Sequence, residues 1–218
     1  MQYVLGGIII HISEGILSAQ VLLAGMGAGA VGVAVGLKNL SEDQIPEVAI
    51  VSAALFVASL IHLPLGPSSV HLILNGIAGI LLGWKVFPAL LVALFMQAVL
   101  FQHGGLTVLG INLINVALPA VLVGYVFRRI FTNREADERL WGIAAALAGG
   151  LAVLLTALLV VLILVTSDAS AFSEVAGVIF ISHLPVVVLE GMLSGAVVVF
   201  LLKVKPEILT QKRVSQLS

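Results

Sequence analysis

Apolar residues form long blocks along this chain, and short polar segments separate the blocks. A helix that crosses a bilayer needs about 20 mainly apolar residues, so each block is a candidate transmembrane helix. The seven blocks are 15–37, 45–62, 70–84, 86–101, 106–130, 141–165 and 175–202. This pattern predicts an all-α, polytopic integral membrane protein with about seven transmembrane helices. We expect one domain, 1–218, made of an N-terminal segment (1–14), a helical bundle (15–202) and a C-terminal tail (203–218).

The segment 61–76, IHLPLGPSSVHLILNG, interrupts this pattern between the second and third blocks. Its prolines prevent a continuous helix, and irregular backbone at membrane depth is tolerated only where protein buries it. The third and fourth blocks are also short for a full crossing. We therefore expect the break to be folded into the bundle, where it lets His71 point inward.

The composition narrows the class of protein. The chain is 61% hydrophobic and 10% charged, with a mean hydropathy of +1.22, which leaves too few charges for a water-soluble surface. Its net charge of -1 gives no reason to expect nucleic-acid binding, and the absence of cysteine excludes disulfides and thiolate ligands. The Walker A, His-Glu-x-x-His and Gly-x-Ser-x-Gly motifs are missing, so we expect a protein that is not an enzyme and has no ATPase of its own.

The basic residues predict the orientation in the membrane, because lysine and arginine accumulate on the cytoplasmic side. If every block crosses once, all ten fall on the same side, at or after the ends of the first, third, fifth and seventh blocks. The N-terminus is therefore predicted outside the cell and the C-terminus in the cytoplasm.

The histidines fall on the opposite, outer side: His11, His62, His71, His103 and His183. A single histidine is often an interfacial residue bonded to a carbonyl, but five on one side favour a shared role. Without cysteine, clustered neutral imidazoles suit Ni²⁺, Co²⁺, Cu²⁺ or Zn²⁺. The alternative is an intramembrane metal-dependent enzyme or a proton-relay transporter that uses histidine and Glu190. A relay needs ionisable groups through the whole membrane depth, which favours the binding role here.

Four motifs carry a resemblance to a known family: HISEGILS, IHLPLGPSSVHLILNGIAGILLG, FQHGGLTVLGINLINVALPA and SHLPVVVLEGMLSG. From His11 to about Leu209 the chain resembles the CbiM/NikM family, the metal-binding substrate-capture (S) subunits of energy-coupling factor (ECF) importers. The resemblance implies a multi-pass protein of the prokaryotic cell (inner) membrane that needs no cofactor and binds Ni²⁺ or Co²⁺ as cargo. The sequence does not separate nickel from cobalt, because both accept the same nitrogen ligands.

The resemblance also implies a ligand set. In that family a free N-terminal amine, the backbone nitrogen and imidazole of the next histidine, and an imidazole from the loop before the third helix hold the ion. Carried over, the histidines are His11 and His71, and such an all-nitrogen set favours Ni²⁺ and Cu²⁺, and to a lesser degree Co²⁺, over hard cations. Family members begin Met-His-Ile, whereas ten residues precede His11 here. Either the mature chain starts at Ile10, or the site lacks the amine ligand.

Other polar residues are candidates for orienting the imidazoles or lining the mouth of the site: His62, Ser69, Asn75, His103 and Asn112. Asn115 is a further candidate. The alternatives are that Ser69 caps a helix and that the asparagines bond between helices. Glu190 needs a partner within its apolar block, and we expect His183, seven residues earlier on the same helix face, to supply it.

Small residues at four-residue spacing mark one face of the first block: Ala24, Ala28, Gly32 and Gly36. Such a face lets helix backbones approach closely, either within the bundle or between chains. The resemblance implies docking of this face on a transmembrane T subunit (CbiQ/NikQ-like), which links to two ATPase subunits (CbiO/NikO-like). A small auxiliary membrane subunit of the CbiN/NikN type is a further candidate partner.

Overall fold

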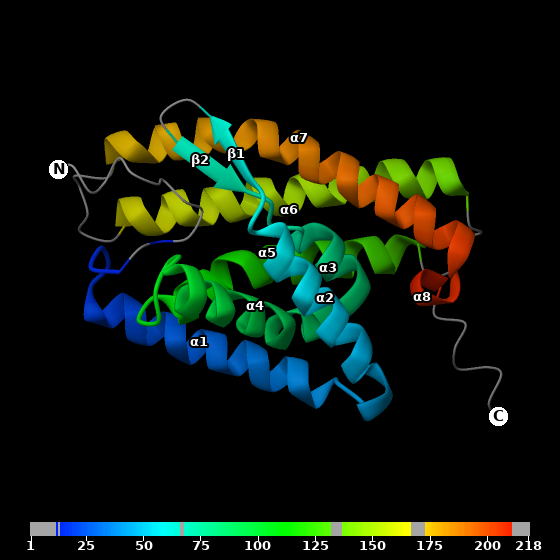
Figure 1. Cartoon of the computed structure of the whole chain (residues 1–218), viewed down its shortest axis with the longest axis horizontal. Coiled ribbons are helices and arrows are strands. Elements are labelled where there is room, and N and C mark those ends of the chain that lie inside the picture. The colour runs from blue at the N-terminus through cyan, green and yellow to red at the C-terminus, as the bar shows by residue number, and fades with distance from the viewer. Residues whose placement is uncertain (1–11, 13, 66–67, 132–136, 167–172, 211–218) are drawn as a thin grey trace.

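The computed structural model describes residues 12, 14–65, 68–131, 137–166 and 173–210. The main helices of this part are α1 (Ala19–Lys38), α2 (Ile45–Ala58), α3 (Asn75–Leu82), α4 (Val86–Phe101), α5 (Leu109–Phe131), α6 (Glu138–Thr166) and α7 (Ser173–Val204). Shorter elements are α8 (Glu207–Thr210) and the 3-10 turns η1 (Glu42–Gln44) and η2 (Gly83–Lys85). Each apolar block thus contains one helix, and the predicted helical membrane fold is confirmed (Figure 1).

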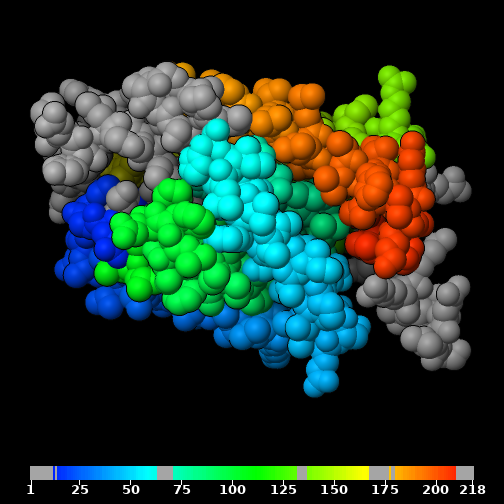
Figure 2. Space-filling model, viewed as in Figure 1, coloured from blue at the N-terminus to red at the C-terminus, as the bar shows by residue number. Residues whose placement is uncertain are grey.

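Five stretches of the described residues are long and apolar enough to cross a membrane: Ala19–Lys38, Asn75–Phe101, Leu109–Phe131, Glu138–Thr166 and Phe180–Val204. The second of these stretches contains α3, η2 and α4. The helix α2, with 14 residues, is shorter than any of the five stretches. Large apolar side chains such as Leu23, Ile50, Leu147 and Met192 are exposed, as a lipid-facing surface requires. In Figure 2, α2 and the end of α4 lie on the visible face of this surface.

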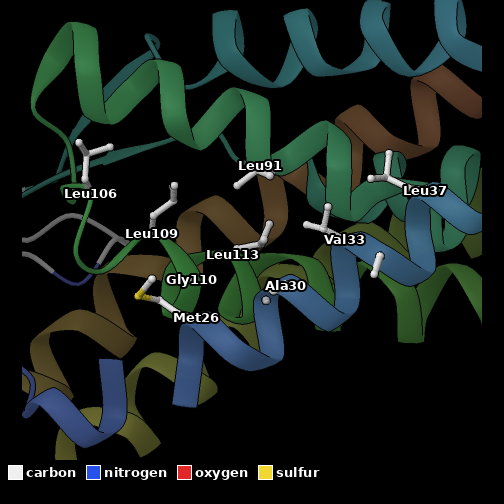
Figure 3. A pocket seen from close by; sticks show the side chains of 11 residues that line it. Met26, Ala30, Val33, Leu37, Leu91, Leu106, Leu109, Gly110 and Leu113 are labelled. Atoms are coloured by element: carbon white, nitrogen blue, oxygen red, sulfur yellow. The ribbon is translucent and has the colours of Figure 1, made fainter. Parts of the chain in front are cut away.

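An apolar groove runs along this surface between α1, α4 and α5 (Figure 3). Met26, Ala30 and Val33 line it from α1, facing Leu91 of α4 and Leu113 of α5. Because the lining residues are apolar, the groove is compatible with the hydrocarbon region of a bilayer.

The break before α3 is an antiparallel hairpin of β1 (His62–Leu65) and β2 (Ser68–His71). The sequence predicted a loop here and carried helices into both ends of it, but α2 stops at Ala58 and α3 starts at Asn75. Strand pairing satisfies backbone groups that the prolines exclude from a helix, which explains the difference. The register sets His62 directly opposite His71, and β2 lies alongside α7 (Figure 1).

The half-helix α3 lies at the centre of the bundle. Its eight residues extend about 12 Å, less than half of a hydrocarbon core that is about 30 Å thick. A Cβ atom on Gly79 would collide with the backbone of Ala120, so α3 touches α5 backbone to backbone. At its other end Gly83, with φ of +58°, starts the turn into α4. Since α3 cannot cross alone, the chain enters the bundle between the hairpin and α3, and His71, at the end of β2, is buried there.

Candidate metal-binding site

His71 ends β2 and is buried, with 2% of its surface exposed. Its Nδ1 lies 2.9 Å from the carbonyl oxygen of Leu72. A carbonyl can only accept, so Nδ1 carries the proton in the neutral ring and Nε2 carries the lone pair. Burial lowers the pKa of His71 to about 4, against a smaller opposite effect of the bond to Leu72. At neutral pH the ring is uncharged, which is the form that binds a metal ion.

Two further imidazoles connect His71 with the surface. The ring centroids of His62 and His71 are 6.0 Å apart, and those of His62 and His103 are 5.4 Å apart. His62 is exposed, and its Nδ1 donates to the carbonyl of Leu60 at 3.0 Å. His103 is half-buried, and its pKa is lowered by burial and, to a smaller degree, by His62. The three rings thus lie close together, and the role of His62 and His103 at the mouth of a site stays a prediction.

The second histidine carried over from the family resemblance, His11, lies outside the described residues. Within the described part of the chain, no group of three or more histidine, cysteine, aspartate or glutamate side chains is arranged to hold a metal ion. The imidazoles of the hairpin and of His103 therefore do not form a complete site on their own.

The residue after His11 is held by Asn112. The Oδ1 atom of Asn112 accepts from the backbone nitrogen of Ile12 at 2.9 Å, and Nδ2 donates to the carbonyl of Ile12 at 3.0 Å. Both residues are buried. Asn112 was expected to orient an imidazole; instead it fixes the backbone of the N-terminal segment on α5, next to a predicted ligand.

The other candidates have different roles. Asn75 donates to the carbonyl of Val116 at 3.1 Å and to Oγ1 of Thr156 at 2.9 Å, so it links α3 to α5 and α6, as the interhelical alternative predicted. Asn115 is 1% exposed, and within the described structure neither polar atom of its amide has a hydrogen-bond partner. Ser69 pairs with Pro64 across the hairpin, and its side chain lies outside the described residues.

Glu190 of α7 is fully buried, and its described hydrogen-bond partners differ from the expected His183. Its carboxyl group accepts hydrogen bonds from the backbone nitrogens of Ile73 and Leu74, the latter at 2.9 Å to each oxygen. These N–H groups precede α3 and have no partner within the helix, and no pattern of side chains in the sequence indicates that Glu190 would bind them. His183 is itself buried, and it makes the smallest of the contributions that lower the pKa of His71.

The small residues of α1 divide into two sets. A Cβ on Gly32 would collide with the ring of Phe87, and one on Gly36 would collide with Trp84 and Pro88. For these two glycines the structure favours the alternative, packing within the bundle. Ala24 and Ala28 are exposed, so the docking prediction stays with them.

Comparisons with known proteins find several metal transport proteins that are similar to this chain. A putative metal transport protein of Haemophilus influenzae is 41% identical over 92% of this chain and 97% of its own length. A putative fused nickel transport protein NikMN of Archaeoglobus fulgidus is 33% identical over 75% of this chain and 55% of its own length. A putative fused cobalt transport protein CbiMQ of Methanocorpusculum labreanum is 28% identical over 88% of this chain and 33% of its own length.

The fold is shared with a solved structure, the crystal structure of a transition metal transporter. It superposes with a TM-score of 0.71 at 27% sequence identity and covers 94% of this chain and 99% of that one. The family model described as the cobalt uptake substrate-specific transmembrane region, CbiM, matches residues 11–208. The chain therefore belongs to the CbiM family of cobalt and nickel transport proteins and is a multi-pass protein of a prokaryotic membrane.

Proposed function

We propose that this chain is the substrate-capture subunit of an ECF-type importer and that it binds Ni²⁺ or Co²⁺ with His71 and His11. The observation that carries the proposal is the state of His71, a buried and uncharged imidazole whose Nδ1 proton is engaged by Leu72. The lone pair is therefore on Nε2, and a borderline divalent cation is the ion that such a nitrogen suits best.

The position of Ile12 supports His11 as the second ligand. Asn112 holds Ile12, and one helical turn further along α5 the carbonyl of Val116 accepts from Asn75. The segment that leads from His71 into α3 and the residue that follows His11 thus meet α5 within about one turn, or about 6 Å of rise. A chain that starts at Ile10 would add its amine and the backbone nitrogen of His11 to the set.

The test is a calorimetric titration of the metal-depleted full-length chain with Ni²⁺ and Co²⁺, with Mg²⁺ as the hard-cation control. We expect binding of the first two and none of Mg²⁺, with protons released and affinity rising with pH. The N-terminal residue is identified in the same sample, and a chain trimmed to start at Ile10 should bind more tightly. A chain that binds neither Ni²⁺ nor Co²⁺ would reject the proposed function.

The fused relatives suggest the partners. Because one relative is a fused NikMN and another a fused CbiMQ, we propose that this chain assembles with a CbiQ/NikQ-like T subunit and a small CbiN/NikN-like subunit. Two ATPase subunits of the CbiO/NikO type would supply energy, and Ala24 and Ala28 would face the T subunit.

Docking can be tested with a matched pair of α1 variants. Ala28 is exposed and Gly32 is buried, so Ala28→Leu should leave the isolated subunit folded and Ni²⁺ affinity unchanged while preventing co-purification with the T subunit. Gly32→Leu should instead destabilise the isolated subunit, because it overpacks against Phe87. Co-purification of Ala28→Leu with the T subunit would place the docking surface elsewhere.

A further inference from the structure

The short connection between β2 and α3 is held at both of its ends, by the hairpin at one end and by α7 at the other. On the hairpin side, His71 is paired with His62, and the backbone nitrogen of Leu72 donates to the carbonyl of Ile61 at 3.4 Å. On the helix side, the next two backbone nitrogens, of Ile73 and Leu74, donate to Glu190. The direction of the His71 side chain is therefore set between the hairpin and α7.

The backbone at this connection adopts a conformation that needs support. Leu74 has φ of 52°, in the left-handed region that bulky residues rarely occupy. Such a conformation persists only when the surrounding structure imposes it, and it is frequent at ligand sites. The N–H of Leu74 is the group that bonds to both carboxyl oxygens of Glu190. Glu190 thus holds the residue at which the chain turns from the hairpin into α3.

We infer that Glu190 is a positioning residue for metal capture: by binding the amides of Ile73 and Leu74 it fixes the depth and direction at which His71 presents Nε2 to the ion. The inference rests on the proposed function, since it takes His71 as a ligand. Glu190 does not itself touch the metal. Removal of a group that orients a metal ligand typically lowers metal affinity by roughly 10-fold to 100-fold.

The competing explanation is that Glu190 only stabilises α3. The structure supplies a matched comparison, because a side chain also holds the opposite end of this helix. Nη1 of Arg128 donates to the carbonyls of Gly79 and Ile80 at 3.3 and 3.4 Å. Both Glu190 and Arg128 support α3, but only Glu190 bonds next to His71. If both residues only stabilise α3, removing either one should have the same effect on metal affinity. If Glu190 positions His71, only the removal of Glu190 should lower metal affinity.

The experiment measures Ni²⁺ affinity by calorimetry and the electron paramagnetic resonance (EPR) spectrum of bound Cu²⁺ in the full-length chain. The variants are Glu190→Leu, Glu190→Gln and Arg128→Gln, with thermal unfolding of each as the measure of structure. We expect Glu190→Leu to weaken Ni²⁺ binding roughly 10-fold to 100-fold and to change the Cu²⁺ spectrum. Glu190→Gln should lose less, because its carbonyl oxygen can still accept two of the bonds. Arg128→Gln should lower the unfolding temperature yet leave affinity and spectrum unchanged.

Three outcomes overturn the inference. The first is a folded Glu190→Leu chain with wild-type affinity and spectrum; if that variant does not fold, Glu190→Gln with wild-type affinity and spectrum has the same meaning. The second is an Arg128→Gln chain that changes affinity and spectrum as Glu190→Leu does, which would assign Glu190 to helix support alone. The third is a wild-type chain that binds no Ni²⁺. This outcome would also reject the proposed function, whereas the first two outcomes would leave the proposed function standing.

Discussion

The two strands of the hairpin carry histidine at paired positions and place it in opposite surroundings. His62 of β1 is exposed, whereas His71 of β2 is 2% exposed, although the register sets them directly across from each other. The difference comes from the elements next to each strand: β2 lies against α7 and leads into the buried half-helix α3, and β1 comes after the end of α2. Burial, and with it the chemistry of an imidazole, is decided here by tertiary position and not by the local sequence.

The largest effect expected from this comparison is on metal affinity. His71→Ala should abolish high-affinity Ni²⁺ binding, because it removes the buried ring of the pair. His62→Ala should weaken binding much less, since its ring lies at the exposed end of the cluster. Calorimetric titration of the two variants measures both affinities. Equal losses of affinity would contradict the different roles assigned to His62 and His71.

A second prediction concerns two asparagines of the same helix, one turn apart. Asn112→Ala should weaken Ni²⁺ binding on the order of 10-fold, because Ile12 loses both bonds that hold it beside His11. Asn115→Leu is the control: it removes a buried amide that has no hydrogen-bond partner within the described structure, so it should leave affinity unchanged and raise the unfolding temperature. A loss of affinity in Asn115→Leu would instead place this amide in the site.

The third prediction concerns the pH dependence of stability in the metal-free chain and not metal affinity. The pKa of His71 is lowered from 6.5 to about 4 by burial, so the unfolded chain binds more protons between these values. Stability should be highest above pH 6.5 and fall as the pH decreases towards 4, on the order of 2 kcal/mol at pH 4.5. Thermal unfolding of wild type and His71→Asn between pH 7.5 and 4.5 checks this. A wild-type chain no more acid-sensitive than the variant would show that the ring is not buried.

Much of the fold could be predicted because long apolar blocks have few alternatives in a bilayer. The block 86–101 coincides with α4, and α6 differs from its block by only a few residues at each end. The hairpin could not be predicted in the same way, since prolines indicate where a helix stops but not what the backbone pairs with instead. For the same reason the partner of Glu190 was missed: a backbone N–H beside a helix start leaves no mark in the pattern of side chains.

The candidate site was predictable in its residue types more than in its contacts. The placement of histidines on one side correctly grouped His62, His71 and His103, whose rings lie close together. Spacing along α1 grouped Gly32 with Ala28, but in the structure Gly32 packs against α4 and Ala28 is exposed. Which face of a helix is covered depends on its neighbours, and these are set by long-range packing that one helix does not encode.

The most direct test of the central claim is the position of the ion itself. Crystals of the full-length chain loaded with Ni²⁺ should give an anomalous diffraction peak at the nickel edge within coordination distance of Nε2 of His71. We predict this single peak, with the N-terminal segment at His11 completing the set of nitrogen ligands. A peak between His62 and His103, with none at His71, would contradict it.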